Sequence, residues 1–133
     1  MPEEIVVDAS AMIKVLTENS DGAYQLGRRL IGSGLHAPHL LDAEVGDVLR
    51  RKVSRGGLVE EVAVMGLVSL DSLIDMRYPH AGPLTRDAWS LRDRVRFYDS
   101  IYVALAARLD LTLITADARL SRVHGLPCQV EVV

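Results

Sequence analysis

The sequence has one cysteine and no long apolar run, and each lack excludes a class of protein. Cys128 by itself cannot form an internal disulfide framework, and it has no Cys or His neighbours in the pattern of a zinc site. No apolar run reaches the roughly 18–20 residues that a membrane span needs. The first four residues, MPEE, are acidic, whereas a secretory signal begins with positive charge. We therefore expect a cytoplasmic protein with no membrane segment.

Positive charge and aromatic residues are also scarce. The formal net charge is −3 and aromatic residues make up 5% of the chain, so the protein as a whole is not a basic nucleic-acid binder. A cluster of metal-binding carboxylates would itself make the formal charge more negative, so a nucleic-acid enzyme is not excluded. Of the 15 Lys and Arg residues only Lys14 and Lys52 are lysines. Arginine suits bidentate contacts with phosphate, although a codon-driven preference explains its excess equally well.

Length and hydrophobicity indicate one compact domain. A chain of 133 residues fits a single domain spanning residues 1–133. Hydrophobic residues make up 49% of it and the mean hydropathy is +0.17. This apolar balance suggests that a partner covers part of the surface.

Segments typical of strands alternate with segments typical of helices. The expected strands are residues 5–7, 35–37, 74–78, 111–115 and 130–133. The expected helices are residues 10–16, 24–31, 39–53, 59–70, 85–95, 98–109 and 118–123. This alternation predicts an α/β fold with a mostly parallel sheet, and the short apolar strands agree because parallel strands are buried on both faces.

Two acidic residues come just after predicted strands. Asp8 comes after the β-branched run 5–7, and Asp117 comes two residues after Thr115. Because ligands of open parallel sheets bind beyond the carboxyl ends of the strands, these carboxylates are predicted at one rim. The alternative is helix capping, since Asp is a good N-cap and both residues precede short helices.

A third acid lies on an apolar helix face. Asp99 shares its face with Tyr102, Val103 and Ala106, three, four and seven positions later. A buried carboxylate without a partner is costly, so Asp99 must cap the helix, pair with a base or hold a cation.

A fourth acid is expected from the helix predicted over residues 39–53. Asp47 is close to two arginines and is interpreted as a solvated charge. Glu44 lies at the border of the apolar stripe, but periodicity does not exclude Asp42.

Together these segments resemble the PIN-domain ribonucleases, and most closely the VapC toxins of bacterial toxin–antitoxin pairs. The segments that carry the resemblance are 7–10 (VDAS), 37–45 (APHLLDAEV), 98–106 (YDSIYVALA) and 113–120 (LITADARL). They occur in the family's order along nearly the whole chain. The third and fourth together are specific.

The resemblance implies a Rossmann-like α/β/α sandwich and a ribonuclease dependent on Mg²⁺ or Mn²⁺. By position, the catalytic and metal-binding acids would be Asp8, Glu44, Asp99 and Asp117, so the resemblance chooses Glu44 over Asp42. Ser10 and Thr115 would support them. It also implies an RNA substrate, a cognate VapB-like antitoxin and a homodimer.

Phosphodiester hydrolysis explains why these residue types occur together. Carboxylates gathered at one rim repel one another, and a hard divalent cation with oxygen ligands removes the conflict while positioning water for attack. Three nearby arginines, Arg92, Arg94 and Arg96, could contact RNA phosphates. The alternative is a solvated helix face paired with Asp87 and Asp93.

Other functions compete with this hypothesis. A housekeeping PIN nuclease would normally carry an extra RNA-binding domain, and a non-catalytic PIN-fold module would normally have lost some of the acids. A signalling receiver domain also has a doubly wound fold with an acidic magnesium site. A receiver domain carries two adjacent acids after its first strand, whereas this chain has only Asp8 at that position.

Overall fold

The computed structural model describes residues 1–133 and contains one five-stranded sheet in which every neighbouring pair is parallel. The strand order is β3-β2-β1-β4-β5. The strands are β1 (Glu4–Val7), β2 (Gly34–Pro38), β3 (Met76–Tyr78), β4 (Thr112–Thr115) and β5 (Val130–Val132). The predicted α/β class with a parallel sheet is confirmed.

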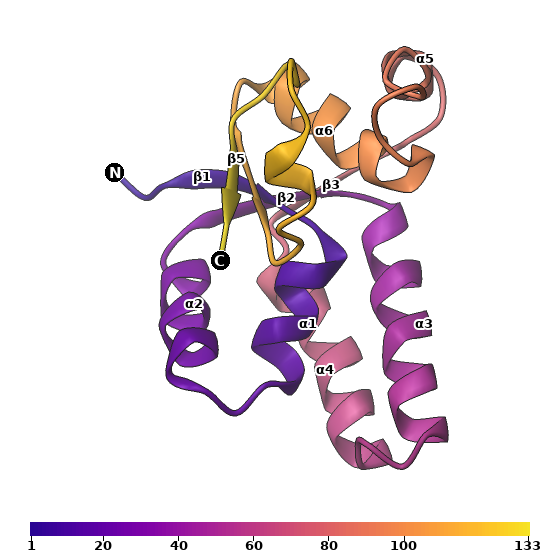
Figure 1. Ribbon diagram of the computed structural model, residues 1–133. Coiled ribbons are helices and arrows are strands. Elements are labelled where there is room, and N and C mark those ends of the chain that lie inside the picture. Colours follow the sequence, from indigo (N-terminus) through magenta and orange to yellow (C-terminus); the bar gives the residue numbers. More distant parts are fainter.

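Helices cover both faces of the sheet, which makes an α/β/α sandwich (Figure 1). Four lie on one face: α1 (Ala9–Thr17), α2 (Asp21–Ile31), α3 (Leu40–Ser54) and α4 (Glu60–Leu73). The other face carries α5 (Pro83–Trp89) and α6 (Phe97–Leu109), and a short 3₁₀ turn, η1 (Leu120–Arg122), follows β4. The antiparallel pair α3–α4 extends well beyond the sheet. None of the helices combines the length and apolarity needed to cross a bilayer.

The core lies where the apolar strands meet α6. Every residue of β1 after Glu4 is buried, and so is each residue of α6 from Ser100 to Ala106. Ala104 and Ala106 are small enough to let this helix approach the sheet closely. Fully buried side chains of this kind contribute about 1.5–3 kcal/mol each for the larger aliphatic residues, so the β1–β4–α6 layer is a rigid base for what projects from it.

Two predicted segments differ from the structure. The helix expected over residues 85–95 ends at Trp89 and continues as turns, in which Leu91 N–H donates to Ala88 O and Arg92 N–H donates to Trp89 O. The helix expected over 118–123 is the shorter η1. In both places backbone bonds span three residues instead of four, and such bonds tighten the chain into turns.

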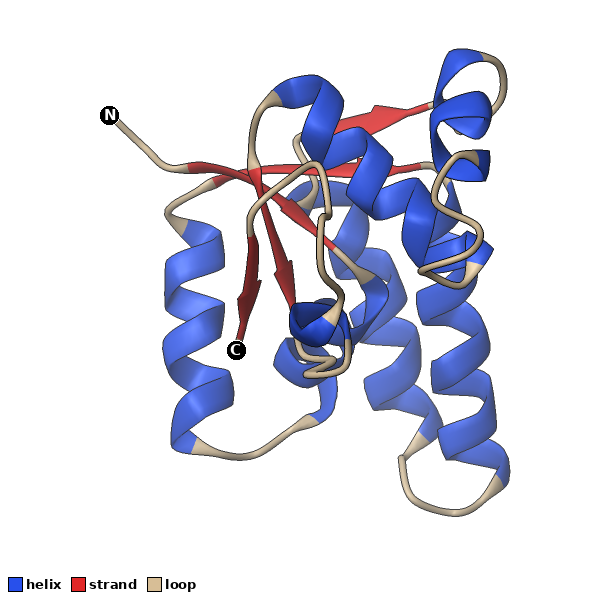
Figure 2. Ribbon diagram, turned by 45° about the horizontal axis from the view of Figure 1, so that its top comes forward, coloured by secondary structure: helices blue, strands red, loops and turns tan.

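The strand order reverses direction between β1 and β4, which are adjacent in the sheet. Figure 2 shows the strands fanning out with the sheet's twist and the helices packed on both sides. Connections leaving neighbouring strands toward opposite faces open a crevice at their carboxyl ends, where ligands of doubly wound folds bind. Asp8 and Asp117 follow these two strands.

Candidate active site

A cleft of about 710 Å³ opens at the carboxyl ends of β1 and β4. Its walls come from α1, α3, the start of α6 and the loop after β4. The four acids predicted for the site all line it: Asp8, Glu44, Asp99 and Asp117. The structure therefore brings together acids from distant parts of the chain, of which Asp8 and Asp117 are 109 positions apart.

Asp8 is held by the densest set of hydrogen bonds in the cleft. It is the N-cap of α1, where its Oδ1 accepts from Ala11 N–H at 2.9 Å and from Ser10 Oγ at 2.7 Å. Its Oδ2 accepts from the buried hydroxyl of Thr115. Ser10 Oγ and Thr115 Oγ1 lie 3.1 Å apart. The hydroxyls of Ser10 and Thr115 therefore both lie against Asp8, and this carboxylate caps α1 and faces the cleft at the same time.

Glu44 projects into the cleft from the first half of α3. Its Oε1 accepts a 2.6 Å hydrogen bond from the hydroxyl of Tyr102, a residue of α6 whose ring is buried in the core. Asp42, the competing candidate, instead receives two hydrogen bonds from Arg77, at 2.7 and 2.9 Å. Asp42 is therefore part of a link between α3 and β3 and does not line the cleft.

Arginines accompany the other two acids. Arg96 Nε lies 3.7 Å from Asp99 Oδ2 at the start of α6. Arg119 donates from Nε and Nη2 to both carboxylate oxygens of Asp117, at 3.0 and 2.8 Å. Both arginines line the cleft and are largely exposed, so they bring positive charge to the rim of an acidic site.

The acids of the cleft differ in how strongly they hold a proton. Burial raises the pKa of Asp8, Glu44 and Asp99 above their ordinary values. The charge of Asp99 adds to the rise for Asp8 and Glu44, and the charge of Asp117 adds to the rise for Asp99 itself. In contrast, hydrogen bonds from Arg119 lower the pKa of Asp117. Three carboxylates therefore share a site that penalises their negative charges, as a site built to receive cations would.

The donor chemistry of the cleft fits a hard divalent cation, although the ligands are not yet gathered around one point. No three His, Cys, Asp or Glu side chains converge closely enough to hold a metal ion as they stand. Arg119 holds both oxygens of Asp117, and Arg96 lies beside Asp99. Carboxylate oxygens without a Cys or His nearby suit Mg²⁺ or Mn²⁺ rather than zinc.

The three arginines predicted as phosphate contacts lie in different surroundings. Only Arg96 lines the cleft with the acids. Arg94 donates from Nη1 to the backbone carbonyls of His124 and Gly125, at 3.3 and 2.7 Å. Arg92 lies over the ring of Trp89. None of them pairs with Asp87 or Asp93, and Asp87 pairs with Arg108.

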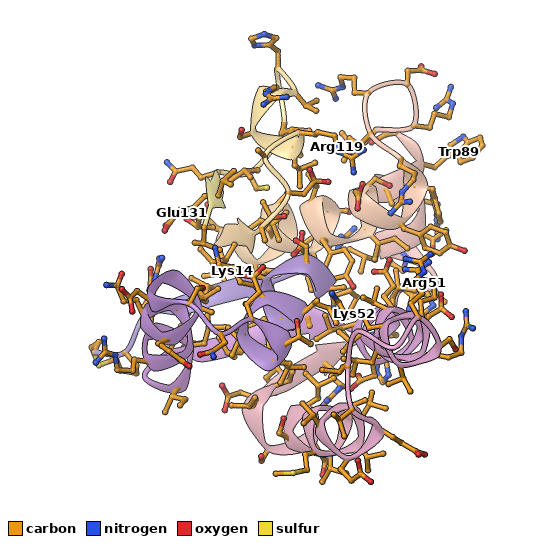
Figure 3. All side chains as sticks on the ribbon, turned by 60° about the horizontal axis from the view of Figure 1, so that its bottom comes forward. Lys14, Arg51, Lys52, Trp89, Arg119 and Glu131 are labelled. Atoms are coloured by element: carbon orange, nitrogen blue, oxygen red, sulfur yellow. The ribbon has the colours of Figure 1, made fainter.

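Several residues that line the cleft were not assigned to it from the sequence. Lys14 and Lys52, the only lysines of the chain, line the end of the cleft between α1 and α3, and neither forms an ion pair. Figure 3 shows them on the side of the molecule across from Arg119. The scarcity of lysine was visible in the sequence, but nothing local linked either lysine to the acids. Arg119 lies two positions after Asp117, and Tyr102 shares a helix face with Asp99, but neither was assigned a role at the site.

Comparisons with known proteins agree with this geometry. A family model described as "PIN domain" matches residues 5–126. The chain is 47% identical to Ribonuclease VapC1 of Mycobacterium tuberculosis over 98% of both chains. Among solved structures, VapBC-5 of the same species is 26% identical with a TM-score of 0.62, covering 99% of this chain and all of that one.

A more distant structure shares the fold. VapBC2 from Rickettsia felis, solved bound to a promoter DNA fragment, superposes with a TM-score of 0.72 at 13% identity over 98% of both chains. The family match and the identity over the whole length leave one assignment: the chain belongs to the PIN domain family and, within it, to the VapC ribonucleases.

Proposed function

We propose that this protein is an endoribonuclease that hydrolyses RNA phosphodiester bonds with divalent cations, Mg²⁺ or Mn²⁺, bound by Asp8, Glu44, Asp99 and Asp117. One observation carries the proposal: four acids from four separate segments line a single cleft at the point where the strand order reverses. A bound divalent ion there would lower the pKa of a water molecule and polarise the phosphate.

The chain's own residues divide the remaining work. Asp8 is held in one orientation by Ser10, Thr115 and the first turn of α1, so it presents a fixed oxygen to a cation. Asp99 and Asp117, which lie beside Arg96 and Arg119, would supply the remaining carboxylate oxygens to the cation. Glu44, fixed by Tyr102, binds a cation through water or orients the attacking water.

Positive side chains on two sides of the acids would bind the RNA backbone. Arg96 and Arg119 lie on one side, and Lys14 and Lys52 lie on the other, between α1 and α3. Phosphate contacts supply most of the affinity in such interfaces and make it depend on salt. This arrangement explains how a chain of net charge −3 can act on a polyanion.

The protein partner that we propose is a VapB-like antitoxin, together with a second copy of the chain. Solved relatives are described as VapBC complexes. The outward face of α4 supports a protein partner, because it exposes Val62, Met65 and Val68, with Met65 72% and Val68 69% exposed. Apolar surface of this kind usually marks an interface. Co-expression with a candidate VapB-like antitoxin, followed by mass measurement in solution, tests both partners.

Metal binding can be tested without any RNA. Titration of the wild-type protein with MgCl₂ or MnCl₂ should raise its melting temperature, because an ion that binds only the folded state stabilises it. Asp8→Asn should largely remove the rise, whereas Asp71→Asn, which changes an exposed acid outside the cleft, should keep it. An equal rise in both variants, or no rise in the wild type, would contradict the metal site.

A further inference from the structure

A second, smaller cavity of about 220 Å³ adjoins the cleft. It shares Arg96, Asp99, Asp117 and Arg119 with the cleft, and it adds Arg94, which does not line the cleft. Three arginines therefore accompany two aspartates in this cavity, whereas the cleft is lined by six acids and five basic side chains. The small cavity thus has an excess of positive charge, which favours an anion as its ligand.

Arg94 is fixed in place by the loop after η1. Its Nη1 donates to the backbone carbonyls of His124 and Gly125, at 3.3 and 2.7 Å. Gly125 has a φ of 73°, and a Cβ at this position would lie 2.9 Å from Nη1, so glycine lets the loop approach the arginine closely. Both hydrogen bonds use the same nitrogen of the guanidinium. Its Nε and Nη2 remain available as donors to a ligand.

Arg96 and Arg119 lie where the small cavity meets the cleft, and they come from distant parts of the chain. Arg96 directly precedes α6, and Arg119 directly precedes η1. Figure 3 shows Arg119 extending from the segment of η1 toward the turns that follow α5. Arg119 binds Asp117 through Nε and Nη2, so its Nη1 is available. The fold therefore directs three separate guanidinium groups to one small space.

The rest of the cavity lining is apolar. Val95 and Leu120 are buried, and Val123 is partly buried. Such a lining offers no hydrogen bond to a base or a sugar, and it strengthens the polar contacts of the arginines by keeping water from one side of them. The volume is also below the roughly 300–1,000 Å³ that is usual for small-molecule sites. The cavity therefore suits a phosphate group better than a whole nucleotide.

Resting on the proposed ribonuclease function, we propose that Arg94, Arg96 and Arg119 bind the terminal phosphate that hydrolysis leaves on one RNA fragment. Hydrolysis breaks one P–O bond of the backbone. The hydroxyl of water joins phosphorus, and the remaining proton of that water goes to the oxygen that leaves. One fragment then ends in a phosphate monoester and the other in a hydroxyl.

A phosphate monoester matches this cavity better than the diesters of intact RNA. It carries about 1.5–2 negative charges at neutral pH and has three acceptor oxygens, whereas a backbone phosphate carries a single charge. Arginine binds such oxygens in pairs. Because Asp99 and Asp117 line both cavities, a phosphate released at the acids is already next to the arginines. The site is expected to retain this product and to slow its release.

Phosphorus NMR titration tests the site with ligands that contain no bond between nucleotides. The probes are inorganic phosphate, uridine 5′-monophosphate, uridine 3′-monophosphate and dimethyl phosphate, a diester with a single charge. The protein is the full chain with Mg²⁺ at about pH 7.5, where a monoester carries nearly two charges. Dissociation constants come from the shift of each phosphorus signal as protein is added.

At least one of the two nucleotides should bind about tenfold more tightly than dimethyl phosphate, and more tightly than inorganic phosphate. Arg94→Gln should weaken this binding by about tenfold, the lower end of the range for losing a hydrogen bond to a charged group. Arg92→Gln changes an exposed arginine outside both cavities and should keep the wild-type constant. Lys52→Gln, which changes the cleft alone, should also keep it.

Equal affinity for the nucleotides and dimethyl phosphate would overturn the proposal, and so would equal effects of Arg94→Gln and Arg92→Gln. A loss of binding in Lys52→Gln instead of Arg94→Gln would place the phosphate in the acidic cleft. Inorganic phosphate that binds more tightly than either nucleotide would assign the cavity to free phosphate. If Arg94→Gln does not fold, the comparison of probes with the wild type and with Lys52→Gln still decides. Nucleotide binding that depends on Arg94, without RNA cleavage by the wild type, would reject the nuclease and keep the phosphate site.

Discussion

Asp8 caps α1 and at the same time faces the cleft. As a cap it accepts backbone and hydroxyl hydrogen bonds, yet burial raises its pKa above the ordinary value of 3.8. The folded protein therefore binds a proton at Asp8 more readily than the unfolded chain does. In the absence of a cation, the charged form of this carboxylate lowers the free energy of unfolding at neutral pH. Such destabilisation is expected of a buried site that binds a positive charge.

Replacing this carboxylate should stabilise the metal-free protein. A group whose folded pKa is raised contributes stability at low pH and loses it as pH rises through the folded pKa. Asp8→Asn keeps a good N-cap residue, and it removes the stability loss that occurs when the buried Asp8 carboxyl becomes charged. We expect its melting temperature to exceed that of the wild type at pH 7 with chelator, by a few degrees for about 1 kcal/mol.

The difference should shrink as pH falls through the raised pKa of the Asp8 carboxyl, because the carboxyl of the wild type then becomes neutral. Thermal unfolding from pH 4 to 8 measures it, with Asp71→Asn as the control. A variant less stable than the wild type across this range would show that the hydrogen bonds to the carboxylate outweigh its burial.

Tyr102 is expected to act through Glu44. Its hydroxyl is the only side-chain partner that positions this carboxylate, so Tyr102→Phe should leave Glu44 free to rotate. Losing such a supporting contact typically lowers metal affinity or activity by about 10–100-fold. Metal titration and turnover on RNA measure the effect, and Tyr24→Phe is the matched control. Turnover within twofold of the wild type would exclude the positioning role.

Some residues of the candidate site can be predicted from their neighbours in the sequence, whereas others depend on contacts with distant residues. Asp8 and Asp117 were predictable because each follows a strand, and strand ends meet at one rim. Periodicity did not separate Glu44 from Asp42, because both lie near one apolar stripe; the family resemblance chose Glu44, and Asp42 pairs with Arg77. The contact of Tyr102 with Glu44 spans 58 positions, and no local pattern encodes it.

At the scale of elements, helix existence was easier to predict than helix ends. The helix predicted over 85–95 ends at Trp89, where the hydroxyl of Ser90 donates to the carbonyl of Asp87 and the chain tightens into turns. Such competition between side chain and backbone is decided by rotamers, which the residue pattern does not reveal.

The end of α6 offers a test of local backbone energy. Asp110 is its C-cap in the left-handed conformation, with φ 55° and ψ 47°. Glycine adopts this conformation without the steric cost that other residues carry. Asp110→Gly should therefore raise the free energy of unfolding by about 0.5–1 kcal/mol.

Asp110→Ala is the informative comparison, because it removes the same carboxylate but keeps a Cβ. We expect it to be less stable than Asp110→Gly in urea-induced unfolding. If alanine and glycine proved equally stable, the left-handed conformation at this position would not be the cause.

At the scale of the whole molecule, one arginine joins both ends of the chain. Arg29 of α2 donates to Glu3, with two bonds of 3.0 Å, and to both carboxylate oxygens of Glu131 in β5. Figure 3 labels Glu131 at the edge of the sheet. These contacts lower the pKa of both glutamates below their ordinary value of 4.5. The N-terminus, α2 and the last strand are thereby held together by charge.

Arg29→Gln should cost about 1 kcal/mol at pH 7, since these partners are partly exposed and water screens them. A carboxylate whose folded pKa is lowered contributes stability above its unfolded pKa and loses it as pH falls through the folded one. The difference in free energy of unfolding between the variant and the wild type should therefore be largest above about pH 5. It should disappear as pH falls through the lowered pKa values of Glu3 and Glu131. Arg28→Gln, an exposed neighbour without an ion pair, is the control. A difference that persists unchanged at pH 3 would point to packing instead of charge.

The function class was also predictable from the whole chain. Each motif is short, but four in order over one α/β domain indicated a VapC-type ribonuclease, and the family match confirms it. The competing receiver-domain hypothesis is wrong.

Cleavage of purified total RNA tests the central claim most directly. The reactions contain wild-type protein with Mg²⁺ or Mn²⁺, wild-type protein with chelator, and Asp99→Asn or Asp71→Asn with metal. We predict discrete fragments with the wild type and Asp71→Asn, and none with chelator or Asp99→Asn. Fragments that persist with chelator, or that Asp99→Asn produces at the wild-type rate, would contradict a metal-dependent nuclease built on these four acids.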